Sequence, residues 1–227
     1  MFKKTLFKNL ILVLFAVAAS LTLFHDHALA LKESQIPNLG RAVEMVVQYR
    51  ESGDWGREID EAGNRGVALL RAAYDPDEKQ AVVFDIDETT LDNYEYLSSN
   101  DFAMVQESWK TWLASGKAPA IQGIKKIYDE AVAKGVYVFF ITGRGEKART
   151  ASDNNLKIAG YLKFEKLIMR DEASLDLTAL DYKSRERAKL EKAGYHIILN
   201  VGDQYSDIFG GHSLHILKVP NPMYFIK

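Results

Sequence analysis

Residues 81–90 read AVVFDIDETT, an apolar run of four residues that ends at two aspartates two positions apart. Short apolar runs of this kind are typical of strands that are buried on both faces of a parallel sheet. Similar runs follow at residues 136–141, 166–169, 196–201 and 214–217, with longer segments between them. Short buried strands that alternate with helices predict an α/β fold with five strands, mostly parallel, and helices on both faces of the sheet.

The segments between the runs show the periodicity of amphipathic helices. In residues 121–132 the apolar side chains recur at helical spacing, and those before the first run, residues 35–74, do the same. Gly53 and Gly56 predict a break that divides this first stretch into two N-terminal helices. The arrangement is Rossmann-like, and the short stretch near residues 93–134 leaves room for only a small helical cap.

The composition is that of an ordinary globular protein. The 227 residues are 47% apolar and carry a formal charge of only −2, so disorder is excluded and no charge pattern suggests a nucleic-acid polymer as partner. The absence of cysteine excludes disulfides, thiolate metal sites and a lipidated cysteine. We find no repeat and no linker, so residues 31–227 are predicted to form a single domain.

The first thirty residues have the pattern of a signal peptide. Lysines come first, an apolar run covers residues 10–24, and Ala28-Leu29-Ala30 supplies the small side chains of a cleavage site. That run is shorter than the roughly 20 residues that a membrane-spanning helix needs. We therefore expect cleavage after Ala30 and an exported protein, periplasmic or secreted, without a stable membrane anchor.

Polar residues follow the predicted strands at the points where the strands end. These residues are Asp85, Asp87, Thr142, Gly143, Arg144, Asp203 and Asp207. Lys183 stands near the start of the helix before the fourth strand and can reach the same edge. Ligands bind at the carboxyl ends of parallel strands, so we expect these side chains to meet there. A carboxylate nucleophile, oxygen ligands for Mg²⁺, and a hydroxyl and an ammonium for phosphoryl oxygens fit phosphoryl transfer.

This set resembles the four motifs of the haloacid dehalogenase (HAD) superfamily of phosphohydrolases. Asp85-x-Asp87-x-Thr89 is similar to the first motif, Thr142 to the second, Lys183 to the third, and Gly202-Asp203 with Asp207 to the fourth. Residues 83–93 (VFDIDETTLDN) resemble the secreted acid phosphatases of subfamily IIIB, which include bacterial class C enzymes and are related to plant vegetative storage proteins. Four motifs in chain order are a far more specific signal than an isolated Asp-x-Asp.

The resemblance implies a role for each motif residue. Asp85 would be the nucleophile and would also touch Mg²⁺. Asp87 would act as general acid and then as base, giving the metal only its backbone carbonyl. Asp203 would be the metal ligand from the fourth strand, and Thr142 and Lys183 would bind the phosphoryl oxygens.

Several other residues near the predicted site have more than one possible role. Gly143 joins the expected substrate-binding residues. Asp207 belongs either to the outer shell of the metal or to a helix cap, and Arg144 either binds the phosphate or pairs with a surface carboxylate. Tyr94 and Trp109 are candidates for stacking on a ring of the substrate, although core packing is the ordinary role of such aromatic residues.

The leading hypothesis is a secreted Mg²⁺-dependent acid phosphatase that hydrolyses small phosphomonoesters, among which 5′-nucleotides are one candidate class, through an aspartyl-phosphate intermediate. The alternative is a catalytically weak storage or phosphate-ester-binding protein on the same fold. Some plant storage members lack the nucleophile, so the presence of Asp85 favours an active enzyme. A two-component receiver domain also uses carboxylates, a threonine and a lysine, but the export signal and the N-terminal helices disfavour it. The natural substrate and the oligomeric state stay open.

Overall fold

The computed structural model describes residues 36–226, so the predicted signal peptide, residues 1–30, lies outside the described residues. Residues Val43–Lys227 form one compact unit. The chain up to Ala42 is a separate unit, and its described part is a bend followed by the first residues of helix α2 (Leu39–Glu51). Across residues 36–226, none of the helices combines the length and the apolar character that crossing a membrane requires.

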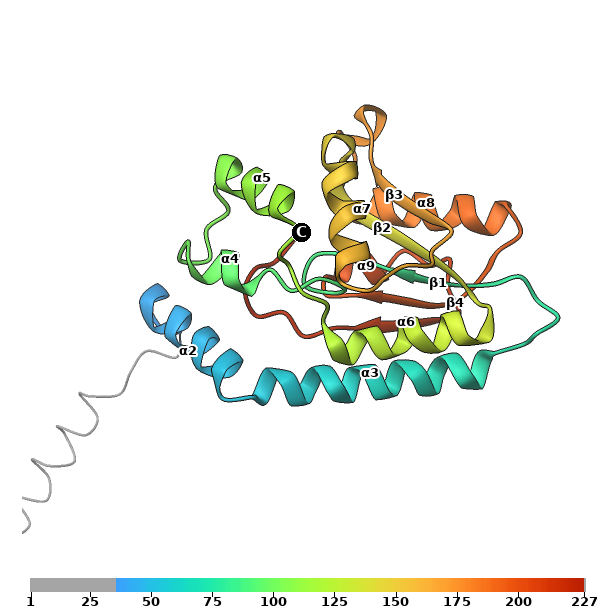
Figure 1. Cartoon of the computed structure of the whole chain (residues 1–227), viewed down its shortest axis with the longest axis horizontal. Coiled ribbons are helices and arrows are strands. Elements are labelled where there is room, and N and C mark those ends of the chain that lie inside the picture. Colours follow the sequence, from blue (N-terminus) through green and yellow to red (C-terminus); the bar gives the residue numbers. More distant parts are fainter. Residues whose placement is uncertain (1–35, 227) are drawn as a thin grey trace, which may run out of the picture. The chain divides into compact units, whose positions relative to one another are not determined.

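Five strands form one wholly parallel sheet in the order β3-β2-β1-β4-β5 (Figure 1). The strands are β1 (Gln80–Phe84), β2 (Tyr137–Gly145), β3 (Lys166–Arg170), β4 (His196–Gly202) and β5 (His215–Lys218). Each coincides with one of the predicted apolar runs, and β2 continues past its run through Thr142 to Gly145. The predicted α/β fold with a five-stranded parallel sheet is therefore confirmed.

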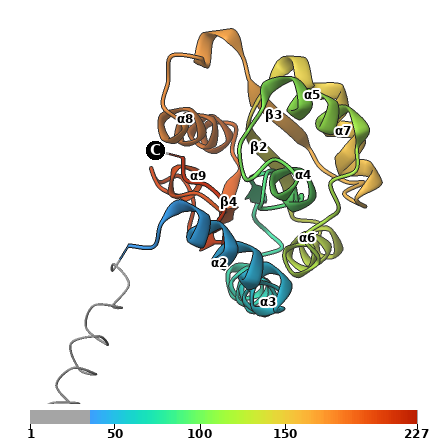
Figure 2. The same cartoon turned by 90° about the vertical axis from the view of Figure 1, so that its left-hand side faces the viewer.

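Helices cover both faces of the sheet, as predicted. They include α3 (Asp54–Ala73), α6 (Gln122–Lys134), α7 (Arg149–Ile158) and α8 (Ala179–Lys192). Alternate side chains of β1 point to opposite layers: Val82 and Phe84 join the core with α3, α6 and α7, whereas Val83 joins the core with α8. Figure 2 shows α8 on one side of the sheet and α6 and α7 on the other. Burial on both faces explains why the strands read as continuous apolar runs.

Helices α3 and α6 touch through their backbones at two glycines. A Cβ atom on Gly63 would lie 1.9 Å from the carbonyl oxygen of Gly123, so this crossing admits no side chain at Gly63. Before α3, the helical conformation is interrupted at Gly53, which separates α2 from α3. Gly53 has a φ of 87°, a conformation that favours glycine. Gly56, the other predicted breaker, lies inside α3 instead.

The stretch near residues 93–134 divides into two parts. Helices α4 (Tyr94–Ser98) and α5 (Gln106–Ser115) lie beyond one end of the sheet (Figure 1), where α5 contacts α7. Helix α6 does not share that place, because its buried side chains pack on α3 and the sheet. The remaining elements are short: the 3₁₀ turns Glu146–Ala148 and Glu172–Ser174 and the helix α9 (Tyr205–Ile208).

Candidate active site

The loop after β1 lies between β2 and β4, at the point where the strand order reverses and α/β proteins bind their ligands. The Asp85 amide donates to the carbonyl of Val201 in β4 at 3.0 Å, which continues the sheet by one residue. The Thr89 hydroxyl donates to Asp203 Oδ1 at 2.9 Å and ties this loop to the end of β4. Between them the chain turns sharply, with Glu88 at a φ of 58°. The first and fourth predicted motifs are thus brought together.

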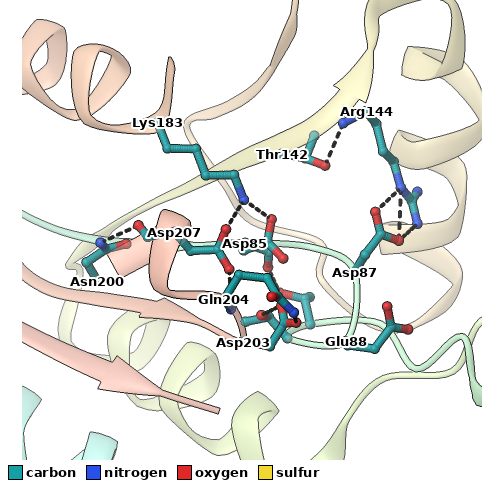
Figure 3. Close-up of polar contacts among 12 residues, drawn as sticks. Asp85, Asp87, Glu88, Thr142, Arg144, Lys183, Asn200, Asp203, Gln204 and Asp207 are labelled. Atoms are coloured by element: carbon teal, nitrogen blue, oxygen red, sulfur yellow. Dashed lines mark hydrogen bonds and ion pairs between the residues drawn. The ribbon is translucent and has the colours of Figure 1, made fainter. Parts of the chain in front are cut away.

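A buried lysine joins two of the aspartates (Figure 3). Lys183 Nζ donates to Asp207 Oδ1 at 2.6 Å and to Asp85 Oδ1. Carboxylate oxygens of Asp85, Asp203 and Asp207 all lie within 4.8 Å of one another, and all three residues are buried. One ammonium does not balance three carboxylates, and buried charges need a partner. This group of oxygen ligands could therefore hold a metal cation.

Burial acts on the ionisation of these groups. It raises the pKa of Asp85 well above its usual range, although the charge of Lys183 opposes the shift. Burial, followed by the charge of Asp207, raises the pKa of Asp203 to about 6. For Lys183, burial alone would lower the pKa, but Asp207 and Asp85 outweigh it and raise the value. The lysine thus stays charged, and its attraction offsets only part of the effect of burial on Asp85.

Asp207 uses both of its carboxylate oxygens. One accepts from Lys183, and the other accepts from the Gln204 amide at 2.8 Å in a capping box at the start of α9. Of the two roles open from the sequence, the cap is therefore present, and the same side chain also borders the aspartate cluster. Gly202 makes this close approach feasible, because a Cβ there would lie 2.3 Å from Asp207 Cβ.

Asp87 points away from the cluster toward Arg144 (Figure 3). Arg144 Nη2 lies 2.6 Å from Asp87 Oδ1, and Nε lies 3.0 Å from Oδ2, a bidentate ion pair. Asn93 Nδ2 also donates to Asp87 Oδ1, at 2.9 Å. The arginine side chain is only 3% exposed. Arg144 therefore pairs with a motif residue rather than with a surface carboxylate.

The second motif contributes a buried hydroxyl and an open backbone. Thr142 is fully buried, and its Oγ1 accepts from the Arg144 amide at 3.1 Å. Gly143 is exposed and lines the pocket above the aspartates. Thr142 thus comes near the site through β2, as predicted, while its hydroxyl oxygen already serves the local turn.

A pocket of about 410 Å³ opens over these residues. Its polar lining includes Asp85, Asp87, Glu88, Gly143, Arg144, Lys183, Asp203, Gln204 and Asp207, and its apolar lining includes Leu97, Phe102, Met104, Trp109 and Ile226. Trp109 is therefore at the pocket, as substrate stacking requires. Tyr94 is not among the described residues that line it, and its ring instead lies 4.4 Å from Arg50 Cζ.

The sequence did not identify several residues of this site. Glu88 is buried, accepts from the Asn93 amide at 3.0 Å and from the Tyr224 hydroxyl, and has its pKa raised to about 8 by burial and then by Asp87 and Asp203. Glu88 lies inside the first motif, so its position in the sequence could have identified it as a residue of the site. Tyr224 and its neighbours near the C-terminus belong to no motif, so no sequence pattern identifies them as part of the site.

The sequence is similar to a known protein family and to several of its members. The model of HAD superfamily subfamily IIIB (acid phosphatase) matches residues 3–227. Acid phosphatase 1 of Solanum lycopersicum is 34% identical over 186 residues, which cover 80% of this chain and 73% of that protein. The stem 28 kDa glycoprotein of Glycine max is 36% identical over 155 residues, which cover 66% of this chain and 61% of that protein.

Solved structures show the same fold. The class C acid phosphatase from Bacillus anthracis aligns with a TM-score of 0.68 at 22% identity, covering 82% of this chain and 86% of that chain. The family model spans nearly the whole sequence, and the pocket is lined by Asp85, Asp87, Lys183, Asp203 and Asp207 of the predicted motifs. The chain therefore belongs to subfamily IIIB of the HAD superfamily, the acid phosphatases, and is a phosphomonoester hydrolase.

Proposed function

We propose that this protein is an exported, Mg²⁺-dependent acid phosphatase that hydrolyses small phosphomonoesters through an aspartyl-phosphate on Asp85. The observation that carries this proposal is the buried cluster in which Lys183 holds Asp85 beside Asp203 at the floor of an open pocket. A nucleophilic carboxylate, a neighbouring cation and oxygen ligands for a metal are the parts that phosphoryl transfer needs.

The donor set fits Mg²⁺. The described residues that line the pocket include no histidine, the sequence contains no cysteine, and hard oxygen ligands favour Mg²⁺ over transition metals. Asp85 and Asp203 would bind the ion together with the backbone carbonyl of Asp87. Asp207 would stay in the outer shell, where it accepts from Lys183 and from the Gln204 amide. When bound, Mg²⁺ would offset the negative charge of the phosphoryl oxygens and favour ionised Asp85.

In the first step a carboxylate oxygen of Asp85 would attack phosphorus. The bond from phosphorus to the leaving oxygen breaks with its electron pair, and Asp87 gives that oxygen a proton, so the alcohol leaves. Lys183 would bind phosphoryl oxygens, together with the backbone of Gly143. Since Thr142 Oγ1 accepts from the Arg144 amide, its own hydrogen remains available for a phosphoryl oxygen.

In the second step water would attack phosphorus and break its bond to Asp85. Asp87, now ionised, takes the proton from that water, and phosphate leaves. Arg144 holds the Asp87 carboxylate in a bidentate pair, so the proton transfers to and from Asp87 would take place beside this guanidinium.

The lining of the pocket indicates the kind of ester. Phe102, Met104 and Trp109 offer an apolar mouth above the charged floor. An aromatic or apolar leaving group can stack there while the phosphoryl group reaches Asp85. The 5′-nucleotides meet this description, as do aryl phosphates, and a panel of nucleotides, sugar phosphates and phosphotyrosine would rank them.

Hydrolysis of p-nitrophenyl phosphate by the purified protein tests the proposal, with and without Mg²⁺ and with Asp85→Asn as the control variant. Activity that requires both Asp85 and the metal supports it. A wild-type protein with no turnover on the whole panel would instead support the storage or binding alternative. Export is tested separately: the protein recovered from the periplasm or the medium should begin at Leu31.

A further inference from the structure

The last residues of the described chain pass along the active site. We call Pro220–Ile226 the C-terminal strap. The Trp55 indole donates to the Pro220 carbonyl at 3.2 Å, and the Tyr224 hydroxyl donates to buried Glu88. Tyr224 and Ile226 line the pocket. The strap is therefore held by hydrogen bonds at Pro220 and Tyr224, and it borders the site at Tyr224 and Ile226.

The strap also reaches Asp203, the metal ligand that we expect from β4. Asn221 Nδ2 donates to Asp203 Oδ2 at 2.7 Å, and Gln204 Nε2 donates to the same oxygen at 2.6 Å. Thr89 donates to the other oxygen. Three donors thus fix both the place and the rotation of a carboxylate that is only 2% exposed. Partners of this kind orient metal ligands, and their loss typically weakens metal binding.

The backbone of the strap decides which end of each amide faces Asp203. The Met223 amide donates to Asn221 Oδ1 at 2.8 Å, and the Ile226 amide donates to Gln204 Oε1 at 2.9 Å. Because both side-chain oxygens are occupied by backbone N–H groups, both NH₂ groups are left to point at the carboxylate. Two separate hydrogen bonds therefore set the same orientation from two points of one segment.

We propose that Asn221 and Gln204, oriented by the backbone of the C-terminal strap, are positioning residues that hold Asp203 ready to bind the metal. This proposal rests on the proposed metal-binding function of Asp85 and Asp203. Asn221 acts only through Asp203. Its loss should therefore lower the affinity for the metal and leave the rate of the metal-bound enzyme nearly unchanged. The strap is in this sense a part of the metal site that lies outside all four motifs.

The test is a Mg²⁺ titration by isothermal titration calorimetry on the purified protein freed of metal with EDTA and dialysed. Wild type is compared with Asn221→Ala and with Phe225→Ser, a strap residue that is 68% exposed. We expect Asn221→Ala to weaken Mg²⁺ binding by about 10- to 100-fold. Phe225→Ser should bind within about twofold of wild type. At saturating Mg²⁺, kcat of Asn221→Ala should lie within a few-fold of wild type. General unfolding would not lower the Mg²⁺ affinity while leaving kcat nearly unchanged.

Mg²⁺ binding by folded Asn221→Ala within twofold of wild type would overturn the proposal, as would an equal loss in Phe225→Ser. Should Asn221→Ala fail to fold, as judged by circular dichroism in EDTA, Gln204→Ala removes the second donor to the same oxygen and must show the weakened binding instead. A wild-type protein that binds no Mg²⁺ would overturn the metal-dependent function itself, which is a different result from a variant-specific loss.

Discussion

Glu88 is a buried carboxyl group whose ionisation should destabilise the metal-free protein. Its pKa is raised from 4.5 to about 8, first by burial and then by the charges of Asp87 and Asp203. Between these two pH values the folded state holds a proton that the unfolded state has released. The free energy of unfolding must therefore fall as the pH rises through this window. Below pH 4.5 the penalty is absent, and above pH 8 it is complete.

The size of the effect follows from the pKa difference. A change from 4.5 to about 8 corresponds to about 5 kcal/mol at the alkaline end. Glutamine imitates protonated Glu88 only in part, because its NH₂ group donates where a carboxyl oxygen accepted, so we expect the replacement to recover less, about 2 to 4 kcal/mol. Glu88→Gln is the suitable change, because its oxygen can accept from Asn93 and the Tyr224 hydroxyl can accept as well as donate.

The assay is urea unfolding followed by circular dichroism in EDTA at pH 5, 6.5 and 8. Glu88→Gln should be about 2 to 4 kcal/mol more stable than wild type at pH 8, or roughly 5 to 15 °C in Tm, and nearly equal to it at pH 5. Glu107→Gln is the matched control, since its side chain is 82% exposed and it should change little at any pH. A gain that is the same at pH 5 and pH 8, or no gain at pH 8, would refute the reasoning.

The remaining predictions concern the nucleophile, the general acid, the buried lysine and the helix crossing. Asp85→Asn should lower turnover of p-nitrophenyl phosphate by about 10⁴-fold or more with an unchanged circular dichroism spectrum, and turnover near wild type would exclude Asp85 as the nucleophile. Asp87→Asn should slow alkyl phosphates by about 10²- to 10⁴-fold and p-nitrophenyl phosphate far less, because that leaving group needs little protonation; equal losses in phosphoenzyme formation would contradict the acid role. Lys183→Met leaves two buried carboxylates unpaired and should cost about 3 to 5 kcal/mol in urea unfolding at pH 8, whereas a neutral result would mean that the pair is not formed in solution. Gly63→Ala should lower the free energy of unfolding in urea by about 1 to 3 kcal/mol or more, since its Cβ would lie 1.9 Å from a backbone oxygen. A variant as stable as wild type would show that α3 and α6 can move apart.

The sheet could be predicted because burial on both faces leaves a direct mark on the sequence. A strand such as β1, with Val82 and Phe84 toward one layer and Val83 toward the other, has to be apolar at every position. The carboxyl ends of such strands meet at one edge whatever the details of packing. For this reason the sequence also predicted that Asp85 and Asp203 come together.

The C-terminal strap could not be predicted in the same way. Asn221 lies eighteen positions beyond the aspartate that it contacts, in a stretch with no periodicity, and its contact depends on how the chain returns after β5. Tyr94 shows the converse case. It follows the first motif closely in sequence, yet it is not among the described residues that line the pocket, and its ring packs on Arg50 and Phe102. Distance along the chain is informative only where a regular element fixes the direction of the side chain.

The sequence motifs also do not reveal the balance of charge in the site. Among the described residues, five acidic ones line the pocket (Asp85, Asp87, Glu88, Asp203 and Asp207), against three basic ones (Lys183, Arg144 and Arg170). The pocket therefore carries an excess of negative charge where a phosphate, itself negative, would bind. Two changes can relieve this excess: a divalent cation among the aspartates, or protons on the carboxyl groups whose pKa values are raised. With pKa values of about 8 for Glu88 and about 6 for Asp203, lowering the pH removes the charges of these two residues. Asp203 has to be ionised to bind a metal well, however, so proton and cation compete at that residue. Under the proposed Mg²⁺ dependence, we expect half-maximal activity at a lower Mg²⁺ concentration at pH 6 to 7 than at pH 5. A concentration that does not change with pH would place the titrating group elsewhere.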